Sequence, residues 1–338
     1  MAEAVEILRR QYLQLLDPKE LAIPTHDILR RPHVQDQIYK SMFKLEDMLF
    51  PIPSRYQLRV LKRLLESIEN AIEDPEEDEI SDDLTNYFAN LISDSRIVAD
   101  ATVQQKNYVT YTAPMLDDNI QRITLLESRS LIASAGTTGL RTWEAALHLG
   151  HFLFSMAGSR LIEGKRIIEL GAGTGFISIL CALHLGAQRV LATDGSGEVV
   201  DHLMSNLFLN DLEGSTKIEA TVLKWGHALI DGIFGTSDSS EPYNLILGAD
   251  VTYDLSSLPP LVATLGELFE KFPGIKAIIS ATIRNEQTIK AFEEACSRRK
   301  FTMNFGDQDL PKGHNQLGFY YSRAVPVRIM VITGPPLA

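Results

Sequence analysis

Glu169-Leu170-Gly171-Ala172-Gly173-Thr174-Gly175 lies between two apolar runs of different kinds. Residues 166–170 form a short run typical of a buried strand, whereas Phe176–Leu185 has the length and spacing of a helix. Glycines tolerate a positive φ and let a ligand approach the bare backbone, and the first turn of a helix offers free N–H groups. The sequence therefore predicts a strand, a ligand-binding turn and a helix in succession.

The same alternation of strand and helix patterns continues along the chain. Further helices are expected at Thr142–Met156 and Glu198–Leu209, and two β-rich runs, Tyr108–Tyr111 and Ile120–Leu126, are expected to pair ahead of them. Seven strands are expected to form the main sheet: Arg166–Leu170, Arg189–Thr193, Ile218–Leu223, Tyr243–Ala249, Lys276–Thr282, Phe301–Phe305 and Val327–Thr333. This pattern predicts an α/β, Rossmann-like fold with a mostly parallel sheet and a site at the carboxyl ends of its strands.

Residues 1–95 have a different pattern, that of amphipathic helices. Apolar residues recur at helical spacing over Val5–Leu15, Val34–Leu49 and Ser54–Glu73, and the third segment opens with a Ser-x-x-Gln resembling a capping box. A chain of 338 residues exceeds the usual size of one domain. We therefore expect a helical N-terminal region over 1–95 and a catalytic domain over 96–338.

Carboxylates dominate the segment from Glu73 to Asp83. A solvated connector is the favoured interpretation of such a run, and a docking site for a basic partner surface is the alternative. Residues 1–100 hold 12 Lys and Arg against 20 Asp and Glu, so they carry −8 of the formal net charge of −12. An acidic chain disfavours broad contact with a nucleic-acid backbone.

Composition excludes several other classes of protein. Hydrophobic residues make up 45% and charged residues 22% of the chain, which is typical of a globular protein. No apolar run is long enough to cross a membrane, and the N-terminus lacks the pattern of a secretory signal, so a cytoplasmic protein is expected. Cys181 and Cys296 fall in apolar helical patterns and are expected to be buried rather than reactive. No cluster has the spacing of metal ligands, so no metal is expected.

The glycine-rich turn distinguishes between two nucleotide-like ligands. A dinucleotide fingerprint needs a third small residue where this chain has Phe176, so pyrophosphate binding is disfavoured. The carboxyl of Glu169 and the Gly-x-Gly-x-Gly spacing instead suit a cofactor that carries an amino acid. Asp194 ends the next strand, where it can accept hydrogen bonds from ribose hydroxyls or simply cap the strand. Trp225 can stack on adenine or serve as a core residue.

Asp250-Val251-Thr252-Tyr253 follows the fourth strand of the main sheet, where the reactive end of the cofactor is expected. The motif lacks the two prolines typical of enzymes that grip planar amines. A carboxylate and an aromatic wall can bind and orient an aliphatic amine instead. Because its negative charge also favours the protonated amine, Asp250 is assigned to binding and orientation rather than to general-base catalysis. His227 and the segment Pro311–Tyr321, with His314, stay ambiguous between packing and substrate contact.

At these residues the chain resembles the seven-strand protein-lysine methyltransferases, whose motif after the fourth strand is Asp or Glu, two variable residues and Tyr. The segment Gly139–Ala146 is similar to that before the first strand in the elongation factor 2 lysine methyltransferases, whose acidic helical N-terminal extension is also similar. The resemblance implies methylation of one lysine of translation elongation factor 2, in the cytoplasm, up to the trimethylated state. We expect the enzyme to be a monomer. S-adenosyl-L-methionine would be the cofactor and S-adenosyl-L-homocysteine the product.

The resemblance also implies roles for particular residues. Asp250 and Tyr253 would form the catalytic pair, and Glu169 remains a cofactor candidate from its position before the glycines. The cofactor contacts implied by the resemblance are Trp143, Gly171, Ala172, Gly173, Asp194, Trp225 and Ala249. Two alternatives stay open: methylation of another protein or a small amine, and a non-catalytic interaction module that keeps the fold. The helical N-terminal region is expected to recognise the large folded substrate, since a single lysine offers little area for selection.

Overall fold

The structure is a computed structural model. It describes residues 2–44, 49–74, 76, 78–94, 106–115, 120–128, 139–229, 234, 241–305 and 316–336. The chain divides into two compact units, Met1–Ser130 and Leu131–Ala338, which are described separately below. In the described part of the chain, no helix is both long and apolar enough to span a membrane.

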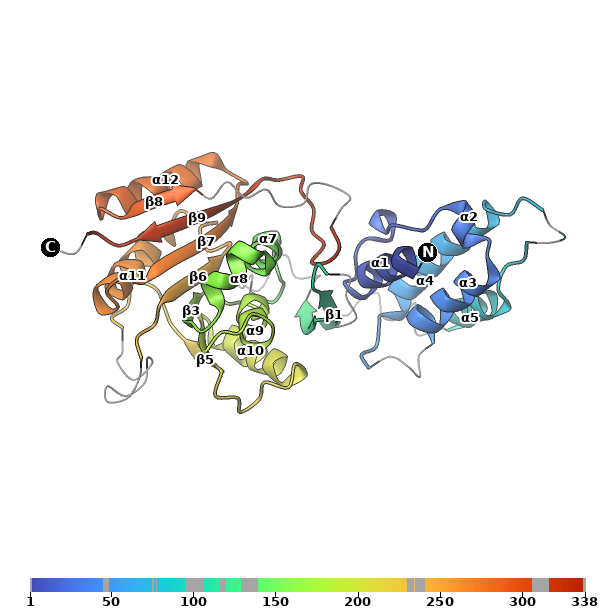
Figure 1. Ribbon diagram of the computed structural model, residues 1–338, viewed down its shortest axis with the longest axis horizontal. Coiled ribbons are helices and arrows are strands. Elements are labelled where there is room, and N and C mark those ends of the chain that lie inside the picture. The colour runs from blue at the N-terminus through green and yellow to red at the C-terminus, as the bar shows by residue number, and fades with distance from the viewer. Residues whose placement is uncertain are drawn as a thin grey trace. The chain divides into compact units, whose positions relative to one another are not determined.

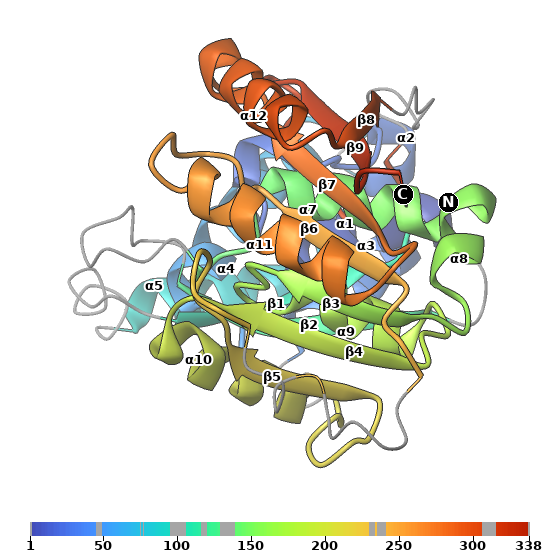
Figure 2. The same ribbon diagram turned by 90° about the vertical axis from the view of Figure 1, so that its left-hand side faces the viewer.

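The second unit is built on a seven-strand sheet whose strands all coincide closely with the expected ones. Its strands are β3 (Arg166–Leu170), β4 (Arg189–Asp194), β5 (Ile218–Val222), β6 (Leu245–Ala249), β7 (Lys276–Thr282), β8 (Thr302–Phe305) and β9 (Val327–Thr333). Their spatial order is β5-β4-β3-β6-β7-β9-β8, which Figure 2 shows from one edge to the other. Strands β3 to β7 are parallel and β9 is antiparallel to both of its neighbours. The α/β, Rossmann-like prediction is confirmed.

The order of the strands places the site. From β3 the chain proceeds to β4 and β5 on one side, and then returns to β6 and β7 on the other side. The register pairs Leu170 with both Thr193 and Gly248, so the three central strands end at the same edge. Ligands bind in the crevice at such a switch point, where helices on opposite faces leave the strand ends uncovered.

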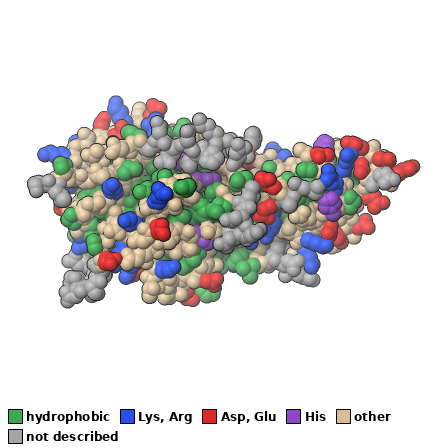
Figure 3. Space-filling view, viewed as in Figure 1, with side chains coloured by type: hydrophobic (Ala, Val, Ile, Leu, Met, Phe, Trp, Pro, Cys, Tyr) green, Lys and Arg blue, Asp and Glu red, His purple; other side chains and the backbone are tan. Residues whose placement is uncertain are grey.

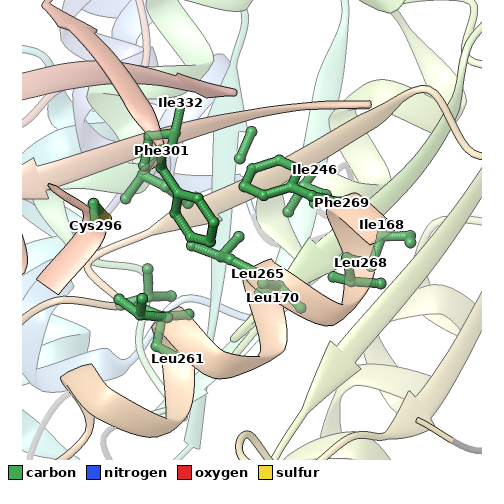
Figure 4. Close-up of a cluster of buried hydrophobic side chains, with 14 of the residues drawn as sticks. Ile168, Leu170, Ile246, Leu261, Leu265, Leu268, Phe269, Cys296, Phe301 and Ile332 are labelled. Atoms are coloured by element: carbon green, nitrogen blue, oxygen red, sulfur yellow. The ribbon is translucent and has the colours of Figure 1, made fainter. Parts of the chain in front are cut away.

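Helices cover both faces of this sheet. They are α7 (Glu144–Phe154), α8 (Met156–Ile162), α9 (Phe176–Leu183), α10 (Gly197–Leu209), α11 (Leu258–Lys271) and α12 (Glu286–Arg298). Leu261, Leu265 and Leu268 of α11 belong to one buried cluster with Ile168 and Ile246 of the sheet, which Figure 4 shows. Successive strand residues point to opposite faces, and Glu169, next to Ile168, bonds to Ser178 of α9. Helix α9 therefore lies on the face opposite α11.

Both cysteines belong to these apolar layers. Cys181 lies in α9 and Cys296 in α12, and each is a buried free thiol. Burial raises the pKa of both thiols, that of Cys296 to about 12. The expectation that they serve as small buried apolar residues is therefore confirmed.

The first unit combines helices with a hairpin. Its elements are α1 (Ala2–Leu13), a 3₁₀ turn (Pro18–Glu20), α2 (His26–Leu29), α3 (Pro32–Ile38), a π-helical turn (Tyr39–Phe43), α4 (Ser54–Glu69), α5 (Asp82–Ser93), β1 (Lys106–Thr112) and β2 (Arg122–Ser128). Figure 1 labels the α-helices and β1. Strands β1 and β2 pair antiparallel, as expected. Buried Arg10 of α1 donates to the carbonyls of Ala113, at 3.4 Å, and Met115, at 2.7 Å. The hairpin thus belongs to the helical unit, and the division at Ser130 differs from the expected one near residue 95.

Two local predictions in this unit are wrong. The expected helix Val34–Leu49 ends at Phe43, and Leu49 is 86% exposed; Leu45 lies outside the described residues. Ser54 is the first helical residue of α4 rather than its cap, so no capping box forms. The buried side chain of Gln57 instead donates to the Ile52 carbonyl and accepts from the Tyr87 hydroxyl, both at 2.7 Å. A carbonyl five residues earlier and the distant Tyr87 hydroxyl thus take the place of the expected cap contact.

The acidic segment has order as well as charge. The Asp78 carboxylate accepts hydrogen bonds from the backbone N–H groups of Glu73 and Asp74, at 2.9 and 3.2 Å. Asp82 and Asp83 lie in the first turn of α5, where the helix dipole favours negative charge. On the face shown in Figure 3, acidic side chains gather over this part of the N-terminal unit. Residues 75 and 77 are outside the description.

Candidate active site

A cavity of about 620 Å³ opens at the carboxyl ends of β3, β4 and β6. This volume is in the usual range for a small-molecule site. All ten predicted site residues line it: Trp143, Glu169, Gly171, Ala172, Gly173, Asp194, Trp225, Ala249, Asp250 and Tyr253. They span more than one hundred residues of the sequence: Trp143 precedes α7, and the others lie at or just after the ends of β3, β4, β5 and β6.

The glycine-rich turn forms the floor of the cavity. Gly171, Gly173 and Gly175 all have a positive φ, of 68°, 53° and 85°. A Cβ at Gly171 would lie 2.8 Å from Val251 Cγ1, and one at Gly173 would lie 3.2 Å from the Gly139 carbonyl oxygen. The turn therefore needs glycine for its conformation and also for the space that it leaves.

Asp194 closes this floor from the end of β4. Its Oδ2 accepts from the Gly173 N–H and its Oδ1 from the Ser196 N–H, each at 3.1 Å. Burial raises the pKa of Asp194, while these amides act against the rise. Because a carboxylate has about four acceptor positions, Asp194 can still accept from ligand hydroxyls.

Glu169 lies deeper, with 2% of its surface exposed. The Ser178 hydroxyl donates to its Oε2. Burial raises the pKa of this carboxyl from 4.5 to about 8. A cationic group of a ligand placed beside it would stabilise the ionised form and lower the pKa again.

Trp225 forms part of the cavity wall. A Cβ at Gly171 would lie 3.4 Å from Trp225 Cζ2, so the ring covers the glycine turn. Its indole N–H is buried and has no hydrogen-bond acceptor among the residues that the structure describes. An unsatisfied buried donor at a cavity is a position for a ligand acceptor.

Asp250 is held in an unusual backbone conformation directly after β6. Its φ is 52°, a left-handed value that is rare outside glycine. Its backbone N–H donates to the Ser280 carbonyl at 2.8 Å. Thr282 donates twice to its carboxylate, from the backbone N–H to Oδ1 at 2.8 Å and from the hydroxyl to Oδ2 at 2.9 Å. Tyr253 follows in the next turn and is 58% exposed.

A charged cluster at this cavity was not predicted from the sequence. Arg284, after β7, lies with its Nη2 3.6 Å from Asp250 Oδ2 and 3.2 Å from Glu144 Oε2. The guanidinium carbons of Arg141 and Arg284 lie 5.0 and 5.1 Å from the centroid of the Trp143 ring. The position of Arg284 just after the expected strand Lys276–Thr282 was the one signal in the sequence that could have placed it at the cavity, since neighbouring parallel strands end at one edge.

The described ambiguous residues are not part of this cavity. His227 does not line it. Phe319 packs edge-on against Phe176, with 5.1 Å between the ring centroids. The Tyr321 hydroxyl lies 2.7 Å from His148 Nδ1. The described part of the segment Pro311–Tyr321 is thus a packed connection, and His314 lies outside the described residues.

The sequence of this chain is similar to those of known methyltransferases. A family model described as lysine methyltransferase matches residues 118–298. The protein-lysine N-methyltransferase EFM3 of Chaetomium thermophilum is 45% identical over 94% of each chain. The protein-lysine N-methyltransferase EEF2KMT of Mus musculus is 27% identical over 52% of this chain and 53% of its own. A solved bacterial CtHen1-C methyltransferase domain has 16% identity and a TM-score of 0.40, covering 56% of this chain and 99% of that one.

Proposed function

The chain belongs to the lysine methyltransferase family, and on that premise we propose that its cavity binds S-adenosylmethionine and that it methylates a lysine of translation elongation factor 2. The observation that carries the proposal is the convergence of the glycine turn, Asp194 and Asp250 on one cavity. The first two suit an amino-acid-bearing nucleoside, and the third suits an amine. A dinucleotide dehydrogenase is disfavoured because Phe176 is fully buried where a third small residue would be needed.

The residues of the cavity fit the cofactor. The Gly171 turn leaves room at bare backbone that a Cβ would fill. Glu169 offers a buried carboxyl to the cofactor's ammonium, and Asp194 offers acceptors to its ribose. The Trp225 N–H offers a donor that no described residue accepts. When bound, S-adenosylmethionine would supply an electrophilic methyl group and leave as S-adenosylhomocysteine.

On the acceptor side, Asp250 binds and orients the amine and Tyr253 forms an aromatic wall beside it. Only a neutral amine is nucleophilic, and roughly one lysine in a few thousand is neutral at pH 7. Desolvation in the cavity lowers the pKa of the amine, and a fixed orientation supplies much of the remaining acceleration. Thr282 keeps Asp250 directed at this position through its two hydrogen bonds.

Elongation factor 2 is proposed as the substrate on two grounds. The segment Gly139–Ala146 resembles that of the elongation factor 2 lysine methyltransferases, and EEF2KMT is among the relatives of the chain. This target would place the enzyme in the cytoplasm, acting as a monomer. We assign recognition of the folded substrate to the N-terminal unit, because specificity for one lysine requires contacts beyond the cavity.

The test is incubation of the purified protein with methyl-labelled S-adenosylmethionine and an extract of cells that lack this methyltransferase. One labelled band at elongation factor 2, absent with Asp250→Ala, is expected. Label on a different protein would discard the target and keep the chemistry. Cofactor binding without any label would favour the alternative of a non-catalytic interaction module.

Removal of residues 1–130 tests the role of the N-terminal unit, since a cut at residue 95 would leave the hairpin without α1. Loss of labelling with unchanged cofactor affinity is expected. Loss of both would indicate a folding role instead.

A further inference from the structure

Arg284 has contacts with both carboxylates of the charged cluster at the cavity. Its Nη2 lies 3.6 Å from Asp250 Oδ2 and 3.2 Å from Glu144 Oε2. The side chain of Asp250 is only 9% exposed, whereas that of Arg284 is 44% exposed. A half-exposed cation therefore lies against the buried carboxylate to which we assign the acceptor amine.

The reaction creates a conflict at this carboxylate. An unpaired Asp250 would attract the incoming ammonium and would also hold its proton, since an opposite charge favours the charged form of the amine. The proton must leave to solvent before the lone pair on nitrogen can react. A fixed cation beside Asp250 would weaken the hold of the carboxylate on the proton of the amine. It would reduce the attraction for the incoming ammonium only in part, because it lies on one side of the carboxylate.

We propose that Arg284 is a positioning residue that pairs with Asp250 and thereby keeps the acceptor lysine in its neutral, nucleophilic form. Arg284 acts by its charge and does not take the proton, which is released to water. The inference rests on the proposed role of Asp250. It adds Arg284 as a determinant of how the rate of methyl transfer depends on pH. Arginine suits this task because its guanidinium stays protonated throughout the working range of pH.

Other groups face Asp250 from the elements around it. Thr282 of β7 donates two hydrogen bonds to it, and Glu144 at the start of α7 lies on the far side of Arg284. Arg141 pairs with Glu144 at 3.4 Å, and Lys224 also lines the cavity. Burial raises the pKa of Asp250, whereas Thr282 and Arg284 act against the rise and Glu144 adds to it.

Arg141 provides a matched control. Like Arg284 it lies about 5 Å from the Trp143 centroid, pairs with Glu144 and is about two-fifths exposed. Unlike Arg284, it forms no ion pair with Asp250 among the described residues. Any effect of general positive charge or of packing on Trp143 should therefore appear in both Arg141→Gln and Arg284→Gln.

The first experiment measures kcat against pH with S-adenosylmethionine and the protein substrate both saturating, because kcat reports the pKa of the bound amine. The substrate is a protein that the wild-type enzyme labels in the extract assay. In Arg284→Gln the midpoint of the rise in rate should move up by about one pH unit, a shift estimated for a partly screened charge near the amine. The loss should be about tenfold at pH 7 and should disappear at high pH. Arg284→Lys should keep the wild-type midpoint, and so should Arg141→Gln.

The second experiment needs no protein substrate. Carboxyl-¹³C aspartate NMR of the enzyme with S-adenosylhomocysteine, with the signal assigned through Asp250→Asn, reports the pKa of Asp250 directly. Arg284→Gln should raise this pKa, because it removes an attractive charge, and Arg141→Gln should leave it nearly unchanged.

The outcomes separate the two proposals. An equal loss of rate at every pH in Arg284→Gln, an equal midpoint shift in Arg141→Gln, or an unmoved pKa of Asp250 would each overturn the role of Arg284. Asp250→Asn tests the premise: if KM for the protein substrate and kcat both stay as in wild type, Asp250 does not bind the amine, whatever Arg284 does.

Discussion

Thr282 donates hydrogen bonds to both oxygens of Asp250, from its backbone N–H at 2.8 Å and from its hydroxyl at 2.9 Å. The two residues end neighbouring parallel strands, β6 and β7. The carboxylate is thereby held in one orientation although its own backbone has a left-handed φ of 52°. Preorganisation of this kind determines where a carboxylate can receive an amine.

We predict that Thr282→Ala lowers kcat/KM about tenfold, because one hydrogen bond to a charged group is lost while the backbone bond stays. Thr282→Ser keeps the hydroxyl and should retain most of the activity. Steady-state kinetics with a labelled methyl group measure both variants. Equal rates for the alanine and serine variants would show that the hydroxyl does not orient Asp250.

Gly171→Ala should impair the cofactor site and the fold together. The residue has a φ of 68°, and its Cβ would lie 2.8 Å from Val251 Cγ1. A cost of about 1–3 kcal/mol in the free energy of unfolding is expected from the strained backbone, with weaker binding of S-adenosylmethionine. Gly197→Ala, where a Cβ meets nothing within 4 Å, is the control. Denaturant unfolding and calorimetric titration should distinguish the two.

Trp143 and Trp225 are the two tryptophans of the chain, and both line the cavity. Binding of S-adenosylhomocysteine should therefore change the intrinsic fluorescence. Trp143→Phe and Trp225→Phe should each retain part of the change, since each leaves one ring at the ligand. A titration that leaves wild-type emission unaltered, while calorimetry detects binding, would contradict the proposed location of the cofactor.

The stability of the cofactor-free protein should depend on pH through Glu169. Its pKa in the folded protein is about 8, above the ordinary 4.5, because the carboxyl is buried. The folded state then holds a proton that the unfolded state has lost, so stability is fully present below about pH 4.5 and declines as pH rises towards 8. Glu169→Gln should remove this component.

The measurement is the melting temperature of wild type and variant from pH 5 to 8.5. The melting temperature of Glu169→Gln should increase relative to that of wild type as pH rises. Glu213→Gln, at an exposed position, should follow the wild-type profile. Parallel profiles for wild type and Glu169→Gln would rule out a protonated Glu169 in the free enzyme.

Gln35→Leu should destabilise the N-terminal unit. The fully buried amide donates to the carbonyls of Leu29 and Glu79, at 3.0 and 3.1 Å, and accepts from the Ser81 N–H at 2.8 Å. Leucine would leave these backbone groups unsatisfied, at a cost of about 2–4 kcal/mol. Gln37→Leu, at an exposed position two residues along, is the control. Comparable unfolding midpoints in denaturant would disprove the importance of this network.

The local features of the catalytic unit could be predicted from the sequence. Most of the seven strands are short apolar runs, and the turn after β3 contains glycine at each position that has a positive φ. Such features depend on residues close to one another in the chain, so hydrophobic period and backbone conformation suffice to identify them. The glycine turn, Asp194 and Asp250 could be located in the same way, because each follows or ends a predicted strand, whereas the roles of Trp143 and Ala249 came from the family resemblance.

Only the tertiary structure decided which side chains meet. Thr282 and Arg284 reach Asp250 from more than thirty residues away, through the register of β6 and β7. Gln57 bonds to Tyr87 instead of capping its own helix, and Arg10 of α1 joins the hairpin to the helical unit. In each case a buried polar group takes the partner that the packing brings within about 3 Å, and no local pattern specifies that partner. The sequence by itself therefore determined the strands, the glycine turn and the family, whereas the electrostatic surroundings of Asp250 depend on long-range packing.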